Sequence, residues 1–192
     1  MENKEKRAAI LNSTVRSIAE HGFHGAPIAV IASHAGVAVG TIYRFFESKD
    51  RLIEETYRKV EGRCLAAAMK DYPSRGSIRQ RLSHLAHGLI RHFMRFPAEF
   101  LFMDQFHSSP YRKSYIPSEQ AVAELCTIVR LLREGTELQL LKDMPPAILL
   151  ALGCGPLIQG LRAHTTGMVH CNEGLISAMV ESCWDLLSRR EA

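Results

Sequence analysis

The chain has 192 residues, of which 46% are hydrophobic and 23% are charged, and its formal net charge is +4. This length is sufficient for one or two domains with a buried core, and the composition is typical of a folded globular protein and argues against a disordered chain. The mildly basic balance permits a nucleic-acid partner but does not require one.

Three features of the sequence indicate the cellular compartment of the protein: the N-terminus, the apolar runs and the cysteines. No apolar segment follows the charged start MENKEKR, so the sequence does not have the form of a secretory signal. Pro and Gly break the longest apolar run, MPPAILLALGCGPLI, before it reaches the roughly 20 residues of a transmembrane helix. The five cysteines are scattered and form no CxxC pair. We therefore expect a cytoplasmic protein with reduced thiols that does not insert into a membrane.

Apolar residues recur at spacings of three and four along most of the chain, and no alternating strand of convincing length is found. The pattern predicts an all-α protein of about nine helices, with residues 108–117 as a loop. In chain order the helices are expected at about 4–21, 27–34, 38–45, 48–72, 78–96, 97–107, 117–134, 145–166 and 172–187.

The segment IAVIASHAGVAVGTIYRFFESKDRL (residues 28–52) contains two short helices joined by a tight turn at Gly36. This is the helix-turn-helix pattern, whose second helix enters the major groove of DNA with its N-terminal residues. Thr41 and Tyr43 would present hydroxyl groups there, and Lys49 could share a phosphate with the next helix N-terminus. The alternative is an ordinary helical hairpin, with Tyr43 in the core and Lys49 as a solvated surface residue.

Residues 8–52 closely resemble the DNA-binding signature of TetR-type transcriptional regulators. The matching elements are GF before the second helix, IA at its centre, the turn AGV, then GTIY, an aromatic pair and SKDRL. The resemblance implies a three-helix DNA-binding domain at residues 1–50 and a helical effector-binding and dimerisation domain at 51–192. It also implies DNA contacts from Val39, Gly40, Thr41, Tyr43, Arg44 and Lys49.

Two positions depart from the signature. Pro27 and Ala38 stand where the family usually has a hydroxyl residue that caps a helix and can contact phosphate. We therefore expect no phosphate contact from either side chain, whereas contacts from the main-chain N–H groups would survive.

The resemblance implies a homodimeric repressor that binds a palindromic operator in double-stranded DNA and is released by a small-molecule effector. Two recognition helices must lie about 34 Å apart to meet successive major grooves. An effector weakens DNA binding only if it binds more tightly to a conformation in which these helices have a different separation. The alternatives are an activator, and a regulator that acts through protein contacts without a small ligand. A cavity of several hundred Å³ in the second domain would favour the effector-binding interpretation.

The dimer interface is expected in the last two helices, at about 145–190, as a four-helix bundle of two subunits. Packing within one chain is the alternative role of these helices. The residues expected to give close approach or bulk are Gly153, Gly155, Gly160, Ala163, Met179, Val180 and Trp184. The candidate lining of the ligand pocket is Phe100, Met103, Phe106 and His107, although a structural core would explain most of this set.

Other chemistry is not supported by the sequence. No Ser-His-Asp set, P-loop or HExxH motif is evident, so we expect no enzyme, no catalytic residue and no cofactor. The pair His84 and His87 could ligate a metal, but no carboxylate or cysteine stands at helical spacing to complete a site, and none is expected. The arginines of 75–95 could form a second nucleic-acid surface, but a solvated face or ligand and inter-domain contacts are favoured.

Overall fold

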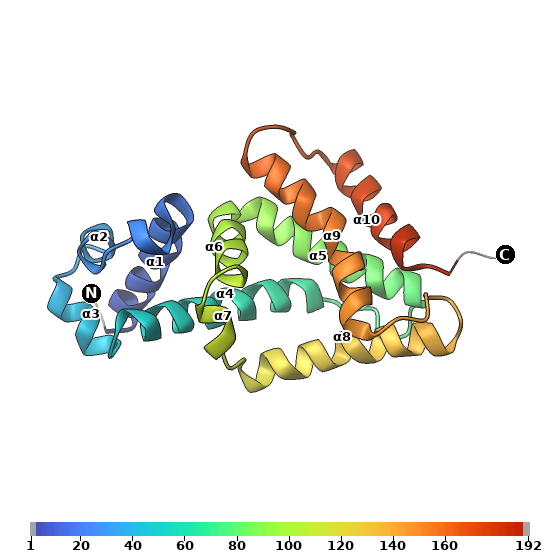
Figure 1. Cartoon of the computed structure of the whole chain (residues 1–192), viewed down its shortest axis with the longest axis horizontal. Coiled ribbons are helices and arrows are strands. Elements are labelled where there is room, and N and C mark those ends of the chain that lie inside the picture. The colour runs from blue at the N-terminus through green and yellow to red at the C-terminus, as the bar shows by residue number, and fades with distance from the viewer. Residues whose placement is uncertain (1–2, 190–192) are drawn as a thin grey trace. The chain divides into compact units, whose positions relative to one another are not determined.

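A computed structural model describes residues 3–189 of the chain, and within this range it contains ten helices and no strand (Figure 1). The prediction of an all-α protein is confirmed. The helices are α1 (Asn3–Gly25), α2 (Ile28–His34), α3 (Val39–Phe45), α4 (Lys49–Met69), α5 (Ile78–Arg95), α6 (Pro97–His107), α7 (Tyr111–Ser114), α8 (Glu119–Glu137), α9 (Pro146–Thr165) and α10 (Glu173–Leu187).

The predicted helix ends are mostly confirmed by local chemistry. Gly22 breaks the helical conformation of α1 with a φ of 72°, as expected of a glycine at a helix end. Ser48 accepts a hydrogen bond from the Arg51 N–H at 3.2 Å, and Asn172 accepts one from the Leu175 N–H at 2.9 Å. Both side chains therefore cap the helices that follow them.

The structure differs from the sequence interpretation at two glycine- or proline-containing places. Helix α8 continues through Gly135, where a Cβ would lie only 2.6 Å from a methyl carbon of Leu141. Gly135 therefore serves close packing and does not end the helix. The second place is the predicted loop 108–117, part of which forms the short helix α7. Helix α9 runs through Pro156, in agreement with the predicted span 145–166.

The continuity of α9 also corrects the expectation about apolar length. By length and composition, α9 is the one single helix among residues 3–189 that could cross a membrane, which is weak evidence because core helices meet the same criterion.

The chain folds into two compact units, and α4 supplies residues to both. Unit 1 is formed by the described part of Met1–Arg63 together with Phe96–Ser118, and unit 2 by Cys64–Arg95 together with the described part of Glu119–Ala192. A functional division at residues 50 and 51 stays a prediction.

Unit 1 buries one apolar cluster beneath the helix-turn-helix segment. Each fully buried aliphatic or aromatic side chain in it stabilises the fold by roughly 1.5–3 kcal/mol. Phe46 is buried in this cluster, and Phe45 is partly buried against it. The fully buried members include Ile10, Ile18, Ile31, Ile42, Leu52, Ile53, Phe102 and Phe106.

Unit 2 buries a second cluster among the end of α4, α5, α8, α9 and α10. Gly88 brings α5 close to α4, because a Cβ there would lie 2.8 Å from the Ala67 carbonyl oxygen. Leu131, Leu132 and Leu149 are buried at the centre of this cluster.

Candidate functional site

Helices α2 and α3 meet at 97°, within the range of helix-turn-helix units. The turn between them depends on Gly36, whose φ of 66° lies in the left-handed region that non-glycine residues avoid. The Val37 N–H donates to the Ala32 carbonyl at 3.0 Å and closes the turn. The local sequence therefore fixes the angle at which α3 leaves α2.

Helix α3 has one buried side and one exposed side. Ile42 is fully buried in the unit 1 core, whereas Val39 and Tyr43 are 40% and 52% exposed. Gly40 and Arg44 are also exposed, and Thr41 is half-buried. Four of the six residues that sequence analysis assigned to DNA contact, Val39, Gly40, Tyr43 and Arg44, are thus exposed on α3. Ile42 anchors the helix behind them.

Buried hydroxyl groups of α1 hold this unit in place. Ser13 Oγ donates to the Ile31 carbonyl of α2 at 2.8 Å, and Ser17 Oγ lies 3.3 Å from His34 Nδ1. Both serines are buried, so a lost partner would leave an unsatisfied polar group. Sequence analysis missed these positioning residues; their signal is two serines four residues apart within the apolar stripe of α1.

Arg7 joins α1 to the far end of the helix-turn-helix. Its guanidinium forms an ion pair with Glu55 of α4 and lies 5.3 Å from the centre of the Phe46 ring. A cation over an aromatic face adds a modest attraction to the ion pair. Arg7 therefore stabilises the start of α4, which directly follows α3.

Lys49 begins α4 and has a structural partner. Its Nζ donates to the Phe23 carbonyl oxygen at 2.9 Å, linking α4 to the segment before α2. An ammonium group has three donors, so two remain for another acceptor. The interpretation of Lys49 as an unpartnered surface lysine does not hold, while its contact with phosphate stays a prediction.

The two departures from the family signature have the expected local effect. Neither Pro27 nor Ala38 makes a side-chain capping hydrogen bond. The first turns are closed by the main chain, with the Val30 N–H donating to Pro27 O at 3.0 Å and the Thr41 N–H to Ala38 O at 2.9 Å.

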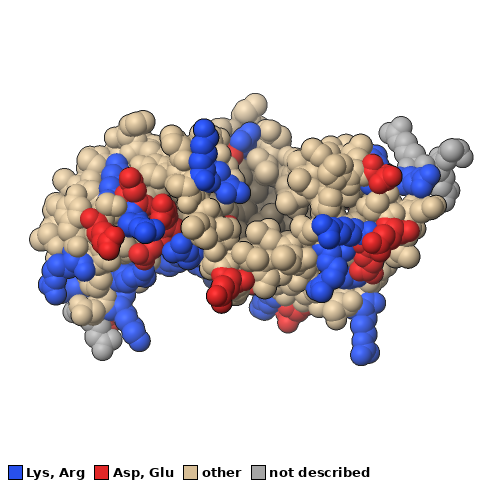
Figure 2. Space-filling model, turned by 60° about the horizontal axis from the view of Figure 1, so that its bottom comes forward, with Lys and Arg blue, Asp and Glu red and all other residues tan. Residues whose placement is uncertain are grey.

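The charge distribution is mixed. Figure 2 shows Lys and Arg side chains interspersed with Asp and Glu over the visible face, without one continuous basic patch. This agrees with the small net charge of +4. The shape and local contacts of α3 therefore support DNA binding more than the overall charge does.

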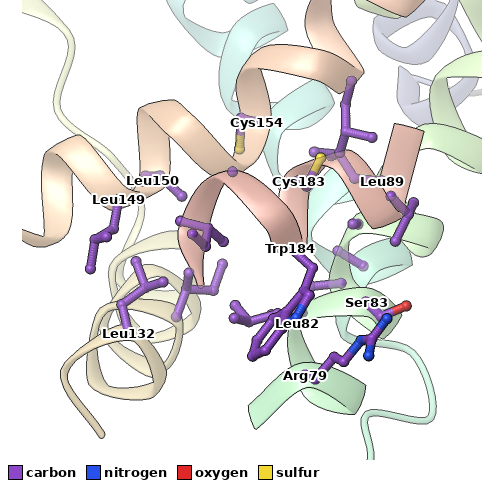
Figure 3. A pocket seen from close by; sticks show the side chains of 18 of the residues that line it. Arg79, Leu82, Ser83, Leu89, Leu132, Leu149, Leu150, Cys154, Cys183 and Trp184 are labelled. Atoms are coloured by element: carbon purple, nitrogen blue, oxygen red, sulfur yellow. The ribbon is translucent and has the colours of Figure 1, made fainter. Parts of the chain in front are cut away.

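Unit 2 contains a cavity of about 110 Å³ among the end of α4, α5, α8, α9 and α10. Its wall is mainly leucine and other apolar side chains, and the polar groups are few. Figure 3 shows Leu132 and Leu149 on one side and Arg79 and Ser83 on the other, with Trp184 beside Arg79. The cavity is smaller than the roughly 300–1,000 Å³ typical of ligand sites.

None of the four predicted pocket residues lines this cavity. Phe100 and Phe106 are buried in unit 1, and Met103 packs partly buried against its core. His107 accepts a hydrogen bond from the Tyr57 hydroxyl at 3.2 Å and donates through Nδ1 to the Met103 carbonyl at 2.9 Å. All four predicted pocket residues therefore have packing or hydrogen-bonding partners within the chain. Their contact with an effector stays a prediction.

The small residues of α9 are used within the chain. A Cβ on Gly153 would meet Leu187 at 3.1 Å, and one on Gly160 would clash with Met179, so both glycines face α10 of the same chain. Met179 and Val180 are buried there. Only Gly155, of the three glycines, has no atom within 4 Å of such a Cβ. The expectation that these residues are available to a second subunit is therefore wrong for Gly153, Gly160, Met179 and Val180.

The same two helices expose a different apolar set. Ile148, Ala151 and Ile158 lie at helical spacing on α9, and Leu175 and Leu186 are exposed on α10. Only 17% of the most apolar 18-residue stretch of α9 is buried within the chain. This exposed set remains uncovered in the single subunit.

Other candidate chemistry is limited. Residues 3–189 contain no group of three or more His, Cys, Asp or Glu side chains placed to hold a metal ion. His84 Nε2 donates to the Lys70 carbonyl at 2.7 Å, and His87 Nδ1 donates to the Ser83 carbonyl at 2.9 Å. A carbonyl oxygen only accepts, so both imidazoles are donors in these contacts.

The cavity cysteines have poorly reactive thiols. Burial raises the pKa of Cys154, and burial together with neighbouring Cys154 raises the pKa of Cys183 to about 11. Because the thiolate is the reactive form, these thiols are unsuited to rapid oxidation.

Comparisons with known proteins agree with this geometry. Residues 10–56 match the family model for bacterial regulatory proteins of the tetR family, and residues 62–189 match the tetracyclin repressor-like C-terminal domain. A TetR family transcription regulator from Marinobacter aquaeolei has the same fold, with a TM-score of 0.85 and 24% identity over 97% of both chains. A putative tetR family transcription regulator from Shewanella has a TM-score of 0.80 and 25% identity, over 96% of this chain and 99% of that chain.

Two curated relatives match over a shorter region. The HTH-type transcriptional regulator BetI of Escherichia coli is 34% identical over 85 residues, which are 43% of this chain and 44% of BetI. The fatty acid metabolism regulator protein of Bacillus subtilis is 28% identical over 82 residues, which are 43% of this chain and 42% of that protein. These matches span less than half of each relative. Together, the exposed recognition helix, the ten-helix fold and the two matched family models show that the chain belongs to the TetR family of transcriptional regulators.

Proposed function

We propose that the protein is a homodimeric repressor that binds a palindromic operator and is released by a small-molecule effector. The observation that carries the DNA-binding part is helix α3, which Ile42 anchors in the core while Val39 and Tyr43 stay exposed. A major groove about 12 Å wide admits one such helix. Val39, Gly40, Thr41, Tyr43 and Arg44 would contact bases or backbone, and Lys49 would contact a phosphate.

The dimer would be built on the exposed apolar set of α9 and α10. Leaving Ile148, Ile158, Leu175 and Leu186 in water forfeits roughly 25 cal/mol for each Å² of apolar surface. A second copy of the same helices would cover this surface and complete a four-helix bundle. The interface would then use Gly155 for close approach, and not the glycines that face α10.

The effector would enter the unit 2 cavity. The apolar wall and few polar groups have the general character of a ligand site, although its volume of about 110 Å³ is small. A larger effector must therefore move helices of unit 2. Such an effector would bind more tightly to the rearranged conformation than to the DNA-bound one, and release from DNA requires this difference in affinity. One solved structure of the same fold, at 16% identity, is the FadR regulator of Bacillus subtilis in complex with stearoyl-CoA. An effector with an apolar part is consistent with the wall found here.

The proposed repressor would act in the cytoplasm, where its operator is accessible. The test is electrophoretic mobility shift with DNA fragments selected by the purified protein from its own genome. Two protomers bound per fragment, with lowered binding by Tyr43→Ala and Lys49→Ala, would support the proposal. An empty selection would overturn it. Transcription from the selected promoter, measured with and without the protein, would separate repression from activation.

A further inference from the structure

We propose that the effector is an amphiphile with a negatively charged head group, which Arg79 recognises at the polar side of the unit 2 cavity. This inference rests on the proposed function, because it names the class of molecule that the same cavity would accept. It is carried by the uneven distribution of charge on the cavity wall.

Among residues 3–189, Arg79 is the only Lys or Arg side chain on the cavity wall. Its guanidinium lies 5.6 Å from the centre of the Trp184 ring, so the indole supports the cation from one side. Ser83 lies one helical turn along α5 and also lines the cavity. Figure 3 places Arg79 and Ser83 together, away from Leu132 and Leu149. The cavity thus has a polar side and an apolar side.

Arg79 is held by an internal carboxylate. It forms an ion pair with Glu181 of α10, and both side chains are about half exposed, at 54% and 56%. Exposed ion pairs contribute little, roughly 0.2–1 kcal/mol. An incoming anion can therefore replace Glu181 at small cost.

The guanidinium is suited to this exchange. It carries five N–H donors in a planar fork, and this geometry matches a carboxylate or phosphate in a bidentate contact. Only one donor group, NH2, is engaged with Glu181. The apolar part of the ligand would then extend toward the leucine side, where each buried CH₂ improves affinity by roughly fourfold.

A cationic ligand is the opposite possibility, because Glu181 also lines the cavity. It is disfavoured since Arg79, supported by Trp184, would stay beside the ligand and repel it. A neutral apolar ligand would bind equally well with or without Arg79. The three classes therefore differ in their response to the charges of Arg79 and Glu181.

The experiment is a titration of the purified full chain with hexanoate, hexanol and hexylammonium, followed by tryptophan fluorescence. Trp184 is the single tryptophan of the chain and lies on the cavity wall, so the signal reports occupancy without DNA. We expect hexanoate to bind about two- to fivefold more tightly than hexanol, as for an exposed ion pair, and hexylammonium to bind most weakly.

Three variants test the assignment of the head group. Arg79→Gln should remove the preference for hexanoate while leaving hexanol unchanged. Glu181→Gln should tighten hexanoate by about two- to fivefold, since the internal competitor is gone. Arg91→Gln is the matched control, because Arg91 also joins α5 to α10, through Glu173 at 3.0 Å, but does not line this cavity. It should change nothing, and circular dichroism checks that all variants fold.

Equal binding of hexanoate and hexanol, or tightest binding of hexylammonium, would overturn the inference. So would no response to any of the three probes. These outcomes are separate from the fate of the proposed function, which is read from DNA. Charge-selective binding that leaves the operator complex intact would support the inference and count against effector-driven release.

Discussion

Replacing Gly36 by alanine isolates the backbone strain of the turn between α2 and α3. Nothing lies within 4 Å of a Cβ built on Gly36 or on Gly40, so neither substitution creates a steric clash. The two positions differ in backbone conformation, because Gly36 has a φ of 66° whereas Gly40 is helical. The left-handed region costs a non-glycine residue roughly 1–2 kcal/mol. In a helix, alanine is favoured over glycine by roughly 0.5–1 kcal/mol.

We therefore expect Gly36→Ala to lower the melting temperature and Gly40→Ala to raise it. For a chain of this size, 1 kcal/mol corresponds to about 2–4 °C. Thermal unfolding followed by circular dichroism measures both changes. Gly40→Ala should still weaken operator binding, because it adds a methyl group to the exposed side of α3. An unchanged melting temperature for Gly36→Ala, or a shift in the same direction for both variants, would show that backbone strain at Gly36 does not limit stability.

Three further predictions concern separate parts of the molecule. Tyr43→Ala should weaken operator binding about 10- to 100-fold in fluorescence anisotropy with little change in melting temperature, and a large loss of stability would show instead that Tyr43 supports the fold. Ile158→Glu should convert the proposed dimer to monomers in sedimentation equilibrium, and an unchanged mass would place the interface elsewhere. Burial, followed by Arg112, keeps the pKa of His107 below its ordinary value of 6.5 although its hydrogen bond to Met103 opposes this. The unfolded chain therefore takes up the proton first, so stability present above about pH 6.5 should decline on acidification toward the lowered pKa. Urea unfolding checks this, and His107→Gln should make the decline shallower.

The sequence was most informative where local chemistry decides the structure. The turn at Gly36 and the helix starts near Ser48 and Asn172 were predicted correctly, because they follow from residue types with specific backbone preferences. The burial of Ile42, which anchors α3, was not predicted and was found only in the structure.

Features that depend on distant contacts could not be predicted in the same way. Gly135 resembles a helix end in sequence, yet Leu141 packs where its side chain would be. Gly153 and Gly160 could face another subunit or α10, and only their proximity to Leu187 and Met179 decides between these partners.

The cavity presents the same difficulty. Its wall combines residues from the end of α4, α5, α8, α9 and α10, and no single helix shows a pattern that distinguishes such a wall from ordinary core. Phe100 and Phe106 form an apolar face in sequence, but the structure places them in the core of unit 1. The contact between Lys49 and the Phe23 carbonyl likewise joins residues that sequence spacing does not relate.

We propose that α3 binds a specific operator as part of a dimer. The most direct measurement is fluorescence anisotropy of the purified protein with a labelled genomic fragment that it selects, across a salt series and beside random DNA of equal length. We expect two protomers per fragment, an affinity that falls steeply with salt, and a strong preference for the selected fragment that Tyr43→Ala and Lys49→Ala both reduce. Equal affinity for random DNA, with neither substitution having an effect, would contradict it.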